Sequence, residues 1–318
     1  MSARAQRAGF LLATLFACAT LALLLGPRPV QAQGEGPRAF ELEPEGSQAV
    51  NVYGVFGRGN ESFDPGSVIP QVEVDLNGSI IEYVHGFALA DRAGSVVVSL
   101  PVGDAVASVQ TTANGVRTYT RSGIGDLQLT AIFGLLGSPA LQAKDYEAYR
   151  PGFALNLLTR VYLPTGSYER TSPVNLGENR RAVQLGLPLA YYLGDSLLDR
   201  GLTTFELAPS VTWYGDNDEP ARGTYSSQAP LLQLEGHITR NLNPVLWISL
   251  DAIFLRGAET TTDGANNHNE QRSFALGISA SVAVSDTVAA TLSYTDEVSR
   301  NVNSAKGRVI RLLAEFSL

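Results

Sequence analysis

The sequence contains few of the side chains on which metal centres, redox sites and disulfide scaffolds depend. Among 318 residues there are one cysteine, one methionine and three histidines, His85, His237 and His268. No HExxH motif and no cluster of Cys and His is present, so a zinc site is not expected. We also expect no cofactor.

Basic residues are scarce as well. Once an N-terminal leader of 32 residues is set aside, 20 Lys and Arg stand against 31 Asp and Glu, a net charge of −11. No basic stripe interrupts this acidic composition. Nucleic acid is therefore excluded as an expected partner.

A long apolar run occurs only near the N-terminus. Arg4 and Arg7 precede an uncharged stretch from Ala8 to Pro27, and Val30-Gln31-Ala32 provides a cleavage site before Gln33. This pattern predicts a cleaved signal peptide over residues 1–32. Cleavage there removes the single cysteine, Cys18, so the exported chain has no disulfide.

Alternation of apolar and small or polar residues dominates the rest of the chain. In residues 274–282 the even positions are Phe, Leu, Ile, Ala and Val, and the odd positions are Ala, Gly and Ser. Such period-two alternation predicts β-strands with one apolar face. The opposite faces carry mostly Gly, Ala, Ser and Thr rather than the Lys and Glu of a soluble sandwich, which favours a closed lumen.

About twelve strands are predicted, and short joins alternate with long polar ones except at 138–149. The predicted fold class is all-β: a transmembrane antiparallel up-and-down β-barrel over residues 48–318, preceded by a periplasmic N-terminal segment over 33–47. We expect it in the bacterial outer membrane, in contact with lipid. The predicted strands are 48–57, 78–90, 93–104, 122–137, 150–164, 180–194, 200–214, 229–241, 244–257, 270–284, 287–297 and 306–317.

Strand parity places nine charged or titratable residues on the inward side, because charges facing lipid are costly. Two interpretations stay open: the residues line a narrow aqueous channel, or acids and arginines pair across the lumen and close it. Two of the acids fall at similar depth, where they form a cation-favouring ring unless Arg160 or Arg311 neutralises them. The nine are Glu82, Asp126, Arg160, Glu206, Glu235, His237, Asp251, Arg311 and Glu315, and the two at one depth are Glu235 and Asp251.

Several motifs resemble those of the outer-membrane β-barrel family assigned to the meta-pathway of phenol degradation. They are Ser122-Gly123-Ile124-Gly125-Asp126, Leu163-Pro164-Thr165-Gly166-Ser167-Tyr168, Asn175-Leu176-Gly177-Glu178-Asn179-Arg180, Glu235-Gly236-His237, Leu246-Trp247 and the Gly257 to Gly264 loop. The resemblance spans about residues 48 to 318. It implies a transporter barrel for small organic compounds. The positions carried over as family motif are Gly123, Gly125, Asp126, Pro164, Gly166, Tyr168, Asn175, Gly177, Asn179 and Arg180.

The expected function is passive passage of small organic solutes, aromatic ones among them. The alternative is a closed structural or interaction barrel without transport. An enzyme is not expected: a twelve-stranded outer-membrane phospholipase needs a Ser two positions from its His on one strand face, but Thr239 and Phe87 stand there instead. The last strand, ending Phe316-Ser317-Leu318, is expected to engage the barrel-assembly machinery.

Overall fold

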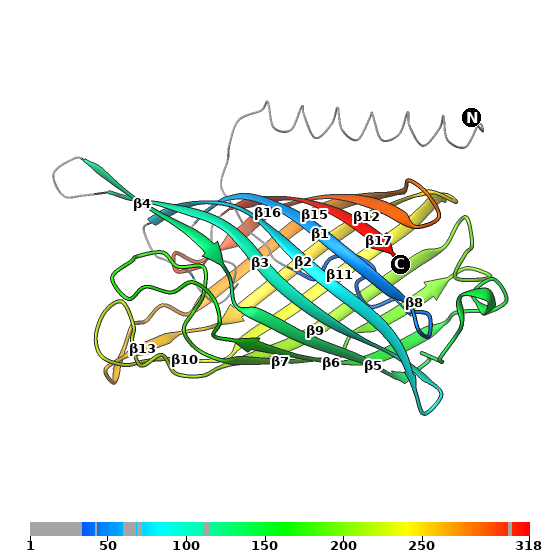
Figure 1. Cartoon of the computed structure of the whole chain (residues 1–318), viewed down its shortest axis with the longest axis horizontal. Coiled ribbons are helices and arrows are strands. Elements are labelled where there is room, and N and C mark those ends of the chain that lie inside the picture. The colour runs from blue at the N-terminus through cyan, green and yellow to red at the C-terminus, as the bar shows by residue number, and fades with distance from the viewer. Residues whose placement is uncertain (1–33, 42, 60–67, 69–71, 111–114, 305–306) are drawn as a thin grey trace.

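The computed structural model describes residues 34–41, 43–59, 68, 72–110, 115–304 and 307–318 (Figure 1). The predicted signal peptide, residues 1–32, lies outside these residues. Among the described residues, no helix combines the length and the apolar character needed to cross a membrane.

Nearly all of the regular structure of the described residues is β-strand, and they contain one short 3₁₀ helix, η1 (Ala143–Asp145). The strands are β1 (Gln48–Gly59), β2 (Val72–Leu89), β3 (Arg92–Gln110), β4 (Val116–Ile124), β5 (Leu127–Leu136), β6 (Phe153–Leu163), β7 (Ala182–Gly186), β8 (Leu189–Leu193), β9 (Thr203–Tyr214), β10 (Ser226–Gln228), β11 (Leu231–Asn243), β12 (Leu246–Gly257), β13 (Thr260–Thr262), β14 (Ala265–Asn266), β15 (Gln271–Ala283), β16 (Val288–Arg300) and β17 (Arg308–Ser317).

Fourteen of these strands form one antiparallel sheet that closes on itself. β17 pairs with β1, and β11 pairs with β9, so the first and last strands meet. Two passes of the chain along the wall, here called crossings, are each made of two consecutive strands. In one crossing β4 and β5 are separated by Gly125-Asp126, and in the other β7 and β8 are separated by Leu187-Pro188. Proline has no N–H for the ladder, which accounts for the second interruption. Twelve crossings result, which confirms the predicted closed antiparallel barrel.

The two faces of the wall follow the predicted alternation. In β15, Phe274, Leu276 and Ile278 are exposed on the outer face, whereas Ser273 and Ser279 are buried on the inner face. Apolar outward side chains suit lipid, and closure leaves no open sheet edge in the bilayer. The chain is therefore an outer-membrane barrel.

The two ends of the barrel differ (Figure 1). β4, β10 and β13 lie at the left end with the long loops, and the C-terminus lies at the right end with most of the short turns. Short turns and chain termini mark the periplasmic end of such barrels. β2 and β3 run further toward the extracellular end than predicted, and polar residues such as Asn77 and Asp104 are exposed on their outer faces there.

The segment before β1 differs most from the sequence prediction. Residues 43–47 lie at the periplasmic end, where Glu45 N donates to Leu141 O and Gly46 N donates to Gly86 O. Residues 34–41, predicted to be periplasmic, instead lie within the barrel: their backbone binds lumen side chains of β9 and β11 (dark blue in Figure 1). Residues 34–41 form no strand, so the alternation that predicts the strands could not predict that this segment lies in the lumen.

Candidate functional site: the barrel lumen and its extracellular vestibule

Carboxylates of the barrel wall hold the backbone of the N-terminal segment. Glu235 Oε2 and Oε1 accept hydrogen bonds from the N–H groups of Glu35 and Gly36, at 2.9 and 2.8 Å. Glu206 Oε2 accepts one from Arg38 N at 2.9 Å. Each of these wall side chains is almost fully buried. These three backbone hydrogen bonds hold the segment along the inner wall of the barrel.

Side chains add charge pairs between the segment and the wall. Arg160 donates from both terminal nitrogens to the two carboxylate oxygens of Glu35, at 2.5 and 2.7 Å. Arg311 Nη1 donates to the carbonyl of Gly34 at 2.8 Å. Arg38 donates to Asn241 Oδ1 at 2.6 Å and stacks over the ring of Trp247. The segment is therefore bound to the wall by the ion pair of Glu35 with Arg160 and by hydrogen bonds to side chains of several strands.

Glu235 and Asp251 do not form the predicted ring of repelling acids, because His237 lies between them. Its ring nitrogens lie 2.8 Å from Glu235 Oε1 and 2.6 Å from Asp251 Oδ1. Carboxylates only accept hydrogen bonds, so a doubly protonated imidazolium satisfies both contacts. Ser249 and Ser279 also donate to Asp251, at 2.5 and 2.6 Å.

The alternative, in which Arg160 or Arg311 neutralises the two acids, does not describe the structure either. Arg160 pairs with Glu35 of the N-terminal segment, and Arg311 binds its backbone, so neither contacts the two acids directly.

The other predicted lumen residues are spread along the barrel. Glu82 accepts hydrogen bonds from Ser99 and Asn51 on neighbouring strands. Glu315 lies on β17 within electrostatic reach of Glu41. Asp126 is part of a separate cluster near the extracellular end.

That cluster is a junction that folds the β6–β7 loop inward. Asp126, between β4 and β5, accepts hydrogen bonds from Gly166 N at 2.8 Å and from Glu178 N at 2.9 Å. Gly166 and Gly177 lie back to back: a Cβ atom on either would meet the other's Cα at 2.7 Å. Three separate motif segments therefore converge here, and only glycine fits at their closest approach.

The loop between β6 and β7, residues 164–181, consequently enters the barrel. Val174 and Leu176 are buried, and they pack against inward-facing residues of β2 and β3. Such burial of aliphatic side chains stabilises the folded loop by about 1.5–3 kcal/mol for each side chain. The packing partners are Val74, Leu76, Ala105 and Ala107.

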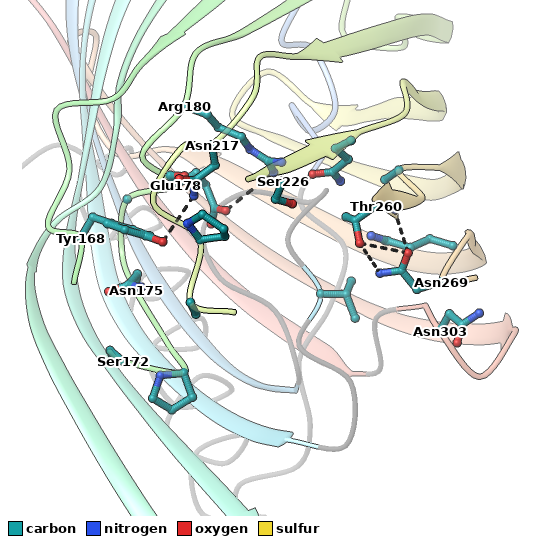
Figure 2. A pocket seen from close by; sticks show the side chains of 18 residues that line it. Tyr168, Ser172, Asn175, Glu178, Arg180, Asn217, Ser226, Thr260, Asn269 and Asn303 are labelled. Carbon is teal, nitrogen blue, oxygen red and sulfur yellow. Dashed lines mark hydrogen bonds and ion pairs between the residues drawn. The ribbon is translucent and has the colours of Figure 1, made fainter. Parts of the chain in front are cut away.

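Above this loop lies a vestibule with a cavity of about 190 Å³ (Figure 2). Tyr168 lines it and donates to Glu219 O at 2.7 Å; burial raises the pKa of this phenol, which keeps it a neutral donor. Asn217 donates to Tyr168 and to the carbonyl of Glu178. The vestibule is lined by polar side chains from several extracellular loops, including Tyr168, Ser172, Asn175, Glu178, Arg180, Asn217, Ser226, Thr260, Asn269 and Asn303.

Two smaller cavities lie in the barrel, each of about 20 Å³. The first shares Glu178 and Arg180 with the vestibule and reaches Asp126. The second lies between Gly34 to Pro37 and the Glu235–His237–Asp251 network. Lumen space is thus wide at the extracellular mouth and narrow beside the N-terminal segment.

Sequence reasoning missed the role of the segment, although glycine offered a signal. A Cβ atom at Gly34 would lie 2.3 Å from Glu235 Oε1, and Gly36 has a φ of +98°. Two glycines flanking Glu35 in a short stretch before the first strand therefore mark a close approach to the wall.

A family model described as "Putative MetA-pathway of phenol degradation" matches residues 56–312, most of the chain. The COG4313 outer membrane channel from Pseudomonas putida F1 has a similar structure: the TM-score is 0.73 at 21% sequence identity, over 89% of this chain and 99% of that one. At this identity the likeness concerns the fold. No curated protein matches the sequence.

Two other solved barrels are more distant. The transport unit of the autotransporter AIDA-I from Escherichia coli gives a TM-score of 0.48 at 10% identity, over 90% of this chain and 93% of that one. The Pseudomonas putida toluene transporter TodX gives 0.40 at 9%, over 89% and 91%. Both scores are too low to support a functional comparison.

Proposed function

Because the chain belongs to the MetA-pathway phenol-degradation family of outer-membrane barrels, we propose that it is a channel for small organic solutes, aromatic ones among them. The observation that carries the proposal is the lumen. Its wall is polar, with six acids against two arginines and one histidine among the nine inward residues, and it opens into a vestibule of about 190 Å³. Twelve strands give a width between filled eight-stranded barrels and open porins of sixteen or more.

The N-terminal segment sets the resting width of this channel. Residues 34–41 are held by hydrogen bonds and ion pairs to side chains and by the packing of Phe40 against Leu158 and Ala208, and they form no strand pairing in the barrel sheet. They can therefore leave the lumen without breaking the ladder of the wall, as elements of low local stability do. We expect passage of an organic solute to need such a displacement, because the cavity between Gly34 to Pro37 and the wall has a volume of about 20 Å³.

The nine inward residues take different parts in this proposal. Arg160, Glu206, Glu235 and Arg311 dock the segment, while His237 and Asp251 fix the geometry of Glu235. Glu82 and Glu315 line the wall nearer the periplasmic end, and Asp126 anchors the infolded loop. Pairing of both acids by His237 removes the basis for a cation-selective ring.

Processing and assembly complete the proposal. Cleavage after Ala32 leaves a chain that starts one residue before Gly34, whose carbonyl binds Arg311. The barrel-assembly machinery is proposed to recognise β17, in which Phe316 is exposed, together with the exposed Leu318 that follows it.

The closed structural barrel is the second candidate, and the docked segment is the observation that favours it. Liposome swelling separates the two. Proteoliposomes carrying the full exported chain should swell in small neutral solutes faster than empty liposomes, and a variant lacking residues 34–41 should swell faster still. If neither form exceeds empty liposomes, the closed barrel is correct.

A further inference from the structure

We propose that the outer face of β12 and β15, at the extracellular end of the barrel, binds phosphate groups of lipids in the outer leaflet. Two exposed arginines, Arg256 and Arg272, form the site. Both lie on the side of the wall that faces away from the lumen, so the proposal goes beyond the channel function and does not depend on it. Three features carry it: the depth of the two arginines, their position opposite each other, and the hydrogen-bond donors that they leave free.

The depth of the arginines matches that of lipid headgroups. Phe254 of β12 and Phe274 of β15 lie opposite each other on the outer face, and Arg256 and Arg272 form the next outward pair toward the extracellular end. A strand rises about 3.3 Å per residue, so the arginines lie about 7 Å beyond this aromatic pair along the strands. Outward aromatic side chains gather at the edges of the apolar belt, where an arginine is far less costly than at the bilayer midplane.

The position of the two arginines places like charges together. They are direct partners in the antiparallel register of β12 and β15. Side chains in such a pair have Cβ atoms about 4.5–5.5 Å apart, and like charges there repel each other. Glu270 offsets one of them, because its Oε1 accepts a hydrogen bond from Arg256 Nε at 3.1 Å. Two positive charges therefore stand against one negative charge, and a phosphate between the guanidinium groups relieves the repulsion.

The outward charges on the next strands do not supply this anion. Asp296 of β16 and Arg308 of β17 form an ion pair at 3.0 Å, so they balance each other. The excess positive charge of the outer face is therefore located at Arg256 and Arg272.

Most donors of the two arginines remain free. Glu270 contacts Nε of Arg256, and no described residue pairs with its two terminal nitrogens. The guanidinium group of Arg272 likewise has no partner in the described part of the chain. A guanidinium group binds phosphate oxygens through two parallel hydrogen bonds. Two such groups on facing strands can therefore hold one phosphate from both sides.

The site is also fixed in position and open to a ligand. Arg272 O accepts a hydrogen bond from Asn301 N at 3.0 Å, and Arg272 N donates to Ser304 Oγ at 2.5 Å, so the β16–β17 loop holds this backbone. The side chains of Arg256 and Glu270 are 56% and 48% exposed. An ion pair this exposed contributes little in water, so a phosphate can displace the carboxylate.

The surroundings select a lipid over dissolved phosphate. The exposed Phe274 and Leu276 lie on the same face of β15, on the membrane side of Arg272, where they contact acyl chains. A lipid with a phosphorylated head thus meets the arginines and the apolar belt with one molecule, and clustered basic side chains at a membrane surface recognise anionic headgroups. Lipid A, a phosphorylated glycolipid of bacterial outer leaflets, is the matched probe.

Native mass spectrometry of the purified full-length barrel in mild detergent tests the proposal. Diphosphoryl lipid A should bind about tenfold tighter than the same lipid with both phosphates removed. Arg256→Gln plus Arg272→Gln should weaken binding of diphosphoryl lipid A about tenfold, because both guanidinium groups are lost. The exposed outer face tolerates glutamine, and each variant must keep the gel shift between unheated and boiled samples that marks an intact barrel.

Arg200→Gln plus Arg240→Gln is the matched control. Both residues are exposed arginines near the short periplasmic turns, at the other end of the barrel, and their loss should leave lipid A binding unchanged. Equal binding of the two lipids, unchanged binding in the Arg256 and Arg272 double variant, or an equal loss in the control would overturn the proposal. Displacement of lipid A by inorganic phosphate at the same concentration would also overturn it, since the site would then bind a free anion.

Discussion

Glu35→Gln should free the N-terminal segment from the lumen while leaving the barrel folded. The substitution removes the charge that pairs with both terminal nitrogens of Arg160, at 2.5 and 2.7 Å. Breaking a buried pair from one side costs about 3–5 kcal/mol. Glu35 and Arg160 keep 21% and 12% of their side-chain surface exposed, and glutamine still accepts one hydrogen bond, so we expect about 2 kcal/mol.

That loss shifts the ratio of docked to undocked segment about 30-fold. In planar bilayers the variant should spend a larger share of time in its highest-conductance state, and residues 34–41 should become accessible to protease. Glu45→Gln is the matched control, because Glu45 also precedes β1 but lies at the periplasmic end of the barrel and is exposed. Arg160→Met added to Glu35→Gln should restore part of the docking, since no buried charge is then left unpaired. Equal open times for wild type, Glu35→Gln and Glu45→Gln would refute the docking argument.

Three further outcomes are expected. Gly166→Ala forces its new Cβ to within 2.7 Å of Gly177 Cα and should cost about 1–3 kcal/mol and make the 164–181 loop protease-sensitive, whereas Gly152→Ala, with open space, should not. Hydrogen bonds from Thr224, chiefly from its backbone N–H, hold the pKa of Asp263 below its usual 3.8. A depressed pKa stabilises the folded loop above the unfolded-state value, so amide protection at Thr224 should persist at about pH 4 and fall only in stronger acid, whereas in Asp263→Asn it should be weaker and should not change over this pH range. A tag inserted at Gly264 should bind antibody on intact cells and one at Asn243 only after the outer membrane is opened; the reverse labelling would mean that the barrel is inverted.

The barrel could be predicted from sequence because its wall is a repeating pattern. Alternation in segments such as 274–282 shows which side chains face lipid. Every strand that crosses the membrane must present apolar side chains to lipid, so the same pattern recurs along the chain. The strand count and the family followed from the same regularity and from motifs such as Gly123-Ile124-Gly125-Asp126. Strand ends were less accurate, because β2 and β3 continue beyond the bilayer, where no apolar belt marks their limits.

The lumen could not be predicted in the same way. Parity says that Glu235 and Asp251 point inward, but it does not say that His237 joins them or that Gly36 donates to Glu235. The contact of Gly36 with Glu235 joins residues 199 positions apart and exists only once the barrel closes, and the contacts of His237 depend on rotamers that parity does not specify. The motif glycines could be seen in the sequence. The reason for glycine at these positions is the close contact of Gly166 with Gly177 beside Asp126, which only the folded structure shows.

Single-channel recording of the purified full-length barrel tests the central claim most directly. A narrow channel with a docked segment predicts small, discrete conductance steps for the wild type and larger steps for a variant lacking residues 34–41. If both proteins are folded by the gel-shift criterion and neither conducts, the lumen is closed by its own wall, and the chain is a structural barrel rather than a channel.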